Sequence, residues 1–176
     1  MALVDYARRM KKIMKVVVFA LVMLSAIGGY AQQAAVDPAM IKFFVGSWGC
    51  AGEFANGKKI EADVSFASEL EGKWLLYRHE DRPPGRFKAT ALWGVDQGSG
   101  KLISVMEDNF GNARLFTSEG WKNGLVTFTR AEFLDQKINQ ERFRYERQSD
   151  NGFKMTYERL VDAQWKMGDF IVCTRK

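Results

Sequence analysis

The sequence is poor in the residues that build most metal and catalytic sites. It contains one histidine, His79, and two cysteines among 176 residues. Structural zinc sites use four protein ligands and catalytic ones three, so a single histidine argues against a metal centre. A serine or cysteine nucleophile needs a base beside it, and the chain offers little for that role. No catalytic constellation is recognisable, and the functional reading has to come from the fold.

Long hydrophobic runs are also lacking. The longest apolar run, Val16–Ile27, has 12 residues, well short of the roughly 20 that a membrane-spanning helix needs. It follows the basic stretch Arg8–Lys15 and precedes the small residues of Gly28–Ala31. This order is typical of a secretory signal peptide cleaved after Ala31; the alternative is a retained anchor. We therefore predict a cleavable signal over residues 1–31, an exported mature protein, and membrane contact only through the uncleaved signal.

An excess of basic charge is lacking once the signal is removed. The whole chain carries 26 basic and 21 acidic residues, with a formal net charge of +5. Residues 1–31 hold five of the basic residues and one of the acidic residues, which leaves 21 and 20 in the mature part. A nucleic-acid binder needs a basic surface that survives processing. Nucleic acid is therefore excluded as the expected partner, and the sequence leaves the oligomeric state open.

Both cysteines, Cys50 and Cys173, lie in the mature part. In an oxidising compartment an even pair usually forms a disulfide. Such a bridge would close a loop of about 120 residues, which the chain-entropy model values at about 4–5 kcal/mol. The alternative is a pair of unpaired buried thiols.

The mature part reads as one all-β domain over residues 32–176. Asp37-Pro38 predicts the start of a short helix that ends near Gly46. Segments of period two, separated by turn residues, follow to the end of the chain. They are residues 48–54, 59–70, 74–81, 87–95, 102–107, 114–118, 125–133, 141–147, 153–160 and 165–174. About ten short strands form either a sandwich or a closed up-and-down antiparallel barrel, and closure removes exposed edges.

The tripeptide Gly46-Ser47-Trp48 at the first strand resembles the Gly-x-Trp signature of the lipocalin and related calycin barrels. In those families the Trp closes one end of the barrel beneath a basic residue from the far end of the domain, which implies Arg175 here. If the first and last strands pair antiparallel, one register opposes both Trp48 to Arg175 and Cys50 to Cys173. This coincidence favours closure of the barrel by its first and last strands. The alternative is a Trp that packs in an ordinary core.

Residues 38–176 as a whole resemble bacterial exported proteins of unknown function with a lipocalin-like or nitrobindin-like barrel. The stretch 44–50 and the later Trp93-Gly94-Val95-Asp96 carry this likeness. The resemblance implies a periplasmic or extracellular location and a cavity that accepts a small hydrophobic or amphipathic molecule. Haem needs only one proximal histidine, which keeps haem binding through His79 as an alternative. Nitrobindin-like proteins, however, place that histidine near the C-terminus, where this chain has residues 165–167 without one, so no cofactor is predicted.

Candidate ligand-binding residues follow from strand parity. Arg159 continues the face of Met155 and Tyr157, and an Arg on an apolar face can anchor a ligand carboxylate; the alternative is that it reaches solvent at the rim. Large and small residues alternate along residues 87–93, which favours a hollow barrel, or else relieves crowding between strands. The predicted ligand-binding set is Arg159, Tyr157, Met155, Trp93, Ala91 and Phe87.

Two other classes of function stay open. An enzyme would use carboxylates at strand ends, where Glu80, Asp81, Glu107 and Asp108 lie, with Glu80 or Glu107 as the acid or base. Its mark would be two carboxyl groups converging in one pocket, at least one of them shielded from solvent. An interaction protein of the cell envelope would have a solid core and act through exposed loops such as residues 82–86. The leading hypothesis is an exported ligand-binding barrel.

Overall fold

The computed structural model describes residues 35–132 and 140–176. The predicted signal peptide and Phe133, which was expected to end the seventh strand, lie outside these residues. Within them the chain forms one helix and ten strands in the order expected. Their bounds are α2 Pro38–Phe44, β1 Gly46–Phe54, β2 Lys59–Glu69, β3 Trp74–Asp81, β4 Lys88–Val95, β5 Leu102–Asp108, β6 Ala113–Ser118, β7 Leu125–Arg130, β8 Glu141–Ser149, β9 Gly152–Val161 and β10 Gln164–Arg175.

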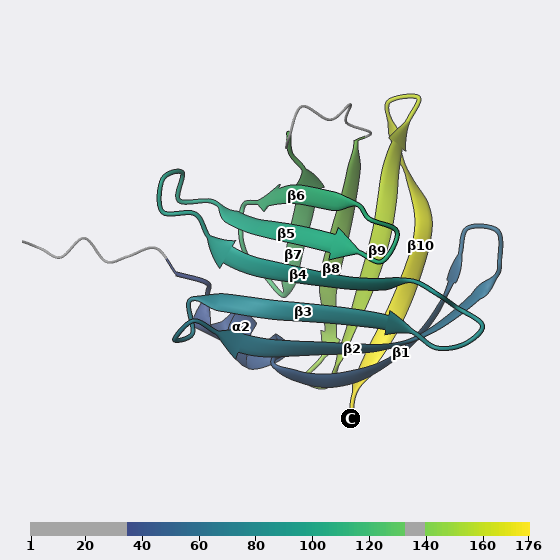
Figure 1. Cartoon of the computed structure of the whole chain (residues 1–176), viewed down its shortest axis with the longest axis horizontal. Coiled ribbons are helices and arrows are strands. Elements are labelled where there is room, and N and C mark those ends of the chain that lie inside the picture. Colours follow the sequence, from purple (N-terminus) through teal and green to yellow (C-terminus); the bar gives the residue numbers. More distant parts are fainter. Residues whose placement is uncertain (1–34, 133–139) are drawn as a thin grey trace, which may run out of the picture. The chain divides into compact units, whose positions relative to one another are not determined.

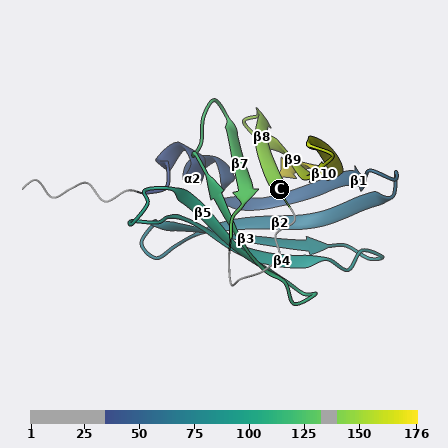
Figure 2. The ribbon, with the colours of Figure 1, turned by 90° about the horizontal axis from the view of Figure 1, so that it is seen from above.

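The ten strands form a closed antiparallel barrel in which each strand pairs with its neighbours in sequence and β10 pairs with β1. Figures 1 and 2 show the strands curving round a common interior, with α2 at one end and the β1–β2 hairpin at the other. Because the barrel is closed, none of these strands has an unpaired edge that could pair with another chain. The prediction of an all-β, up-and-down barrel is confirmed, and the sandwich alternative is wrong.

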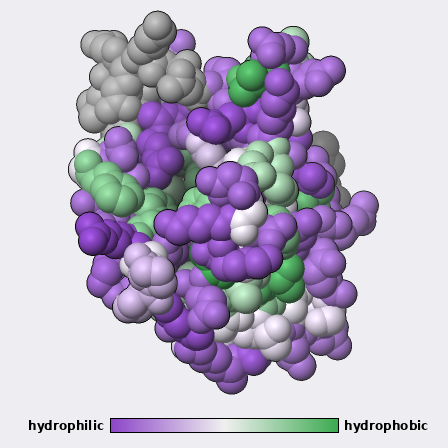
Figure 3. Space-filling model, turned by 90° about the vertical axis from the view of Figure 1, so that its right-hand side faces the viewer, coloured by the Kyte–Doolittle hydropathy of each residue, from purple (hydrophilic) through white to green (hydrophobic). Residues whose placement is uncertain are grey.

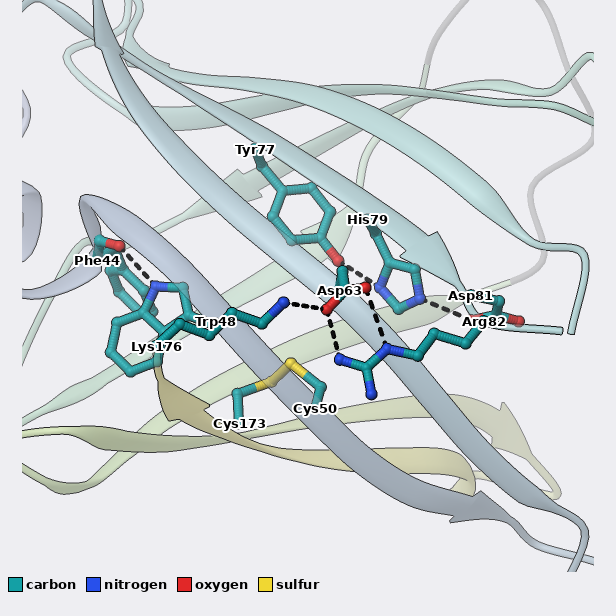
Figure 4. The surroundings of a disulfide bond; sticks show 10 residues. All are labelled: Phe44, Trp48, Cys50, Asp63, Tyr77, His79, Asp81, Arg82, Cys173 and Lys176. Carbon is teal, nitrogen blue, oxygen red and sulfur yellow. Dashed lines mark hydrogen bonds and ion pairs between the residues drawn. A yellow bond between two sulfur atoms is a disulfide. The ribbon is translucent and has the colours of Figure 1, made fainter.

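The predicted register between the first and last strands is also confirmed. Trp48 lies opposite Arg175, and Cys50 lies opposite Cys173. The two cysteines form a disulfide, whose Cα atoms are 4.0 Å apart (Figure 4). The bridge therefore joins the strands at the seam where the barrel closes, and the alternative of free thiols is wrong.

Aromatic side chains fill the end of the barrel beside α2. The helix begins where the Asp37 side chain accepts a hydrogen bond from the Ala39 amide, and it buries Met40, Phe43 and Phe44. Phe44 is fully buried, and its ring contacts strand residues from both sides of the barrel. Its aromatic neighbours are Phe66, Trp93, Trp121, Tyr145 and Phe153, with ring centroids 4.9–6.1 Å away. This end is a packed core.

Arg175 closes this end from outside, as the resemblance implied. Its guanidinium lies 4.2 Å from the centre of the Trp48 ring and donates hydrogen bonds to the carbonyls of Phe43 and Val45 at the end of α2. The indole Nε1 of Trp48 donates to the Phe44 carbonyl at 2.8 Å. Gly46 has a φ of 131°, and a Cβ there would lie 2.8 Å from Arg175 Nη1. The Gly-x-Trp motif and Arg175 thus hold the end of the helix against the first and last strands.

Candidate functional site

The opposite end of the barrel has a different interior. There many of the inward-facing positions, those that continue the parity of the buried residues on each strand, carry polar and charged side chains. We call this set the mouth. It comprises His79, Asp81, Asp108, Arg114, Arg130, Glu141, Tyr157, Arg159 and Asp169. Figure 3 looks at this end of the barrel, where hydrophilic residues predominate and hydrophobic ones show between them.

On β3 the mouth holds a row of hydrogen-bonded side chains. Tyr77, His79 and Asp81 are two residues apart and point to the same face of the strand (Figure 4). The Tyr77 hydroxyl lies 3.0 Å from His79 Nδ1, and His79 Nε2 lies 2.8 Å from the Asp81 carboxylate. The His79 side chain is 5 % exposed and that of Asp81 9 %. Both ring nitrogens are engaged, so haem iron could bind His79 only at the cost of one of these hydrogen bonds.

Across the barrel, β5 to β8 contribute a network of ion pairs. Arg114 donates to Asp108 at 2.8 Å and lies 3.7 Å from Glu141. Arg130 lies 3.5 Å from the same Glu141 carboxylate. The side chains of Asp108 and Arg130 are 2 % and 7 % exposed. Burial lowers the pKa of the Arg130 guanidinium from its ordinary value, and the charge of Glu141 opposes this.

Tyr157 on β9 connects this network to β10. Its hydroxyl donates to Glu141 at 2.7 Å. The pKa of Tyr157 is raised well above its ordinary value; burial is the largest cause and this hydrogen bond the second. The register between β9 and β10 shifts between Met167 and Asp169, and a Cβ on the intervening Gly168 would lie 2.7 Å from the Tyr157 ring. A bulge of this kind redirects side chains, and Gly168 lets the strand lie against the ring.

Asp169 follows the bulge and shares the inward face of Ile171 and Cys173. Burial raises the pKa of its carboxyl to about 6; the influence of His79 and Arg159 lowers it, and that of Asp81 raises it. Asp169 forms no hydrogen bond or ion pair with any side chain in residues 35–132 or 140–176. It is therefore a half-buried acid that still has the capacity to accept hydrogen bonds.

The predicted ligand-binding residues fall into two groups. Ala91, Trp93 and Met155 are at most 5 % exposed and belong to the core. Phe87, Tyr157 and Arg159 lie at the mouth: Phe87 and Tyr157 are half-buried, and Arg159 is exposed, as the rim alternative expected. The Phe87 ring contacts that of His79, with centroids 5.3 Å apart. The mouth therefore holds the accessible half of the predicted set.

The carboxylates at strand ends also separate into two groups. Glu80 and Glu107 are exposed and face outward, whereas Asp81 and Asp108 face the interior. The Asp81 side chain is shielded, and its charge influences the Asp169 carboxyl, whereas Glu80 and Glu107 have no such shielding. The enzyme hypothesis had named the outward-facing members of each pair.

Sequence reasoning missed Arg114, Arg130, Glu141 and Asp169. A usable pattern was present for all four, because they continue the parity of buried apolar residues: Arg114 with Phe116, Arg130 with Phe128, Glu141 with Phe143, and Asp169 with Ile171. Among charged residues, the parity prediction covered Arg159 and none of these four. Applied to every strand, it would have indicated a charged ring inside the barrel.

A concave region with a volume of about 500 Å³ lies on the outer face of β2 to β5. Its lining is polar, and several of its charges are already paired on the surface. Lys88 pairs with Glu80, and Lys176 lies 2.5 Å from Asp63. Hydrogen bonds from Arg82 and Lys176 hold the pKa of Asp63 well below its ordinary value. Exposed pairs of this kind are common on surfaces, and we place the candidate site at the mouth.

In the part of the chain that the structure describes, no three His, Cys, Asp or Glu side chains gather so that they could hold a metal ion. No helix among those residues is long and apolar enough to span a membrane. In comparisons with known proteins, no protein-family model matches this chain and no curated protein has significant sequence similarity to it. The functional conclusion therefore rests on the geometry of the mouth.

Proposed function

We propose that this chain is an exported protein whose barrel binds a small amphipathic molecule at the mouth. The observation that carries this proposal is the concentration of charged side chains inside one end of an otherwise apolar barrel. Taking charges out of water costs several kcal/mol per ion, and apolar residues of similar volume often stabilise a core equally well. A charged interior confined to the accessible end is expected when those groups serve a ligand.

The mouth retains unused hydrogen-bonding capacity. Arg114 Nε is buried without a hydrogen-bond partner in the described residues. Asp169, which is half-buried, accepts no hydrogen bond from a side chain among them. Buried polar groups are normally satisfied, so such exceptions need an explanation. A ligand that supplies the partner at Asp169 provides one.

The apolar part of the ligand has a surface to contact. Phe54, Phe87 and Tyr157 are all half-buried and pack against the core from the mouth side. Ligand sites usually combine such apolar walls with a few polar groups that fix orientation. The molecule would lie with its apolar body against these rings and its polar group among the charged residues.

Export and a lipocalin-like barrel belong to the same proposal. A disulfide between Cys50 and Cys173, buried at 4 % and 0 % exposure, suits an oxidising compartment. The short helix before β1, the Gly-x-Trp motif and the Arg175 guanidinium over Trp48 support the likeness to calycin barrels.

A neutral fluorescent probe tests the proposal without assuming the sign of the ligand's charge. Nile red is expected to bind the purified protein, and Phe87→Ser to weaken its binding roughly tenfold, because the lost apolar contact is worth about 1–2 kcal/mol. Leu92→Ser is the matched control, since Leu92 lies on the outer face of β4, the strand that begins directly after Phe87. It should leave the dissociation constant unchanged.

Native mass spectrometry of the protein isolated from its own compartment provides the second arm. A bound mass that organic extraction removes would support the proposal. An apo mass alone, together with no saturable binding of Nile red, would overturn it.

A further inference from the structure

We infer that the polar group of the ligand is an ammonium cation, so that the mouth takes a small amine with an apolar body and Asp169 is its anchor. The inference rests on the proposed function and specifies its ligand. The starting point is a comparison of the charged side chains of the mouth: those that have an oppositely charged or hydrogen-bonded partner, and those that have none.

The cationic groups inside the mouth have anionic partners. Arg114 is shared between Asp108 and Glu141, and Arg130 lies beside Glu141. Arg159 is exposed and reaches solvent. Asp81 is likewise matched, through its hydrogen bond with His79. Within the described residues, Asp169 is the inward-facing acid of the mouth that has no hydrogen bond or ion pair. The unmatched interior charge is therefore negative.

Aromatic rings flank the Asp169 carboxyl on both neighbouring strands. Asp169 lies opposite Phe54 on β1 and opposite Tyr157 on β9. Both rings are half-buried and belong to the accessible mouth. A carboxylate between aromatic faces is the chemistry that recognises an ammonium group, through a charge-assisted hydrogen bond and cation–π attraction. A ligand carboxylate would meet repulsion at this position.

Two glycines determine how the backbone places the Asp169 carboxyl. Met167 and Asp169 are two residues apart and would normally face the same side of β10. Because of the bulge at Gly168, Met167 faces outward and Asp169 faces inward. On the other side, a Cβ at Gly52 would lie 1.8 Å from the Phe170 carbonyl oxygen, so only glycine lets β1 approach β10 there. The absent side chain at Gly52 leaves the seam beside Asp169 uncrowded. Gly52 on β1 and Gly168 on β10 thus determine the local strand geometry around Asp169.

Protonation of Asp169 predicts the pH dependence of binding. The titratable groups that face it are Tyr77, His79 and Asp81 on β3, Tyr145 on β8, and Tyr157 and Arg159 on β9, and its pKa is raised to about 6. An ammonium ion binds the ionised carboxylate, which is the main form above pH 6 and is lost as the pH falls through 6. Amine affinity should therefore be constant between about pH 7 and 9, where the amine keeps its proton, and fall steadily below pH 6.

The test is calorimetric titration of three probes that share a phenyl ring: 2-phenylethylamine, 2-phenylethanol and phenylacetate. At pH 7.5 the amine should bind at least about tenfold more tightly than the alcohol, and phenylacetate most weakly. Asp169→Asn should remove the preference for the amine and its pH dependence while leaving alcohol binding intact. Glu107→Gln, which removes an exposed acid on the outer face of β5, is the control and should change neither.

The possible results separate the two claims. Equal affinity for all three probes, or a preference for phenylacetate, would overturn the amine assignment while leaving a ligand-binding mouth. Binding of Nile red with no binding of the amine would also overturn it. The absence of saturable binding for the three probes and for Nile red would instead overturn the proposed function itself.

Discussion

Replacing Cys50 and Cys173 together is expected to lower the free energy of unfolding by about 4 kcal/mol, among the largest effects of any change in this chain. The cross-link spans 123 residues of sequence, nearly the whole folded domain. Joining such distant points restricts the unfolded chain far more than the folded one, because β1 and β10 are already paired at these residues. The native barrel should therefore keep its topology and lose stability.

Equilibrium unfolding in urea measures this effect. Both Cys→Ser and Cys→Ala double variants are needed, because a serine hydroxyl at these two buried positions adds a cost of its own. A reducing agent should lower the stability of the native protein by a similar amount and leave both double variants unchanged. A loss below about 1 kcal/mol in the Ala variant would show that the bridge contributes little to the closure of the barrel.

Replacing Glu141 by alanine is expected to cost about 3–5 kcal/mol. This one carboxylate faces Arg114 and Arg130 and accepts a hydrogen bond from Tyr157. The Arg side chains are 15 % and 7 % exposed, so water screens them poorly once the anion is gone. Removing one member of a buried ionic network leaves a buried charge without its full compensation. The free-energy cost of that change is larger than the net stabilisation that the intact network provides.

Urea unfolding of a short series distinguishes this effect from a simple loss of packing. Glu53→Gln, at an exposed pair with Lys59, is the control and should change stability by less than about 1 kcal/mol. Adding Arg130→Met to Glu141→Ala should recover part of the loss, because one of the two cations that faced Glu141 is then removed. If the second substitution adds its own full cost instead, the two residues are not coupled and the network described here is wrong.

Most of the barrel could be predicted because local patterns determine it. The strand Trp74–Asp81 was predicted to the residue, and most other strand ends to within one or two, since turn residues mark them. The closure register followed from Trp48, Arg175 and the two cysteines. Such patterns can be recognised without knowing which strands that are distant in the sequence lie close together in space.

The mouth was harder to predict because it is assembled from strands far apart in the sequence. Asp81 on β3 and Asp169 on β10 come together only when the barrel closes. Parity counting also fails beyond the bulge: steps of two from Cys173 would carry Met167 inward, yet it is 40 % exposed. An extra residue at Gly168 reverses the alternation; a glycine inside a strand can mark such a bulge, and the sequence prediction did not include one.

Nuclear magnetic resonance of the His79 ring tests the central claim, that the ligand binds inside the mouth. His79 is the only histidine in the chain, and it lies buried beside Phe87 and close to Asp169. Its imidazole signals therefore report on this site alone. Addition of 2-phenylethylamine or 2-phenylethanol should shift them saturably, with the dissociation constant found by calorimetry, and Phe87→Ser should weaken the response. His79 signals that stay fixed at concentrations where either probe saturates the protein would contradict binding at the mouth.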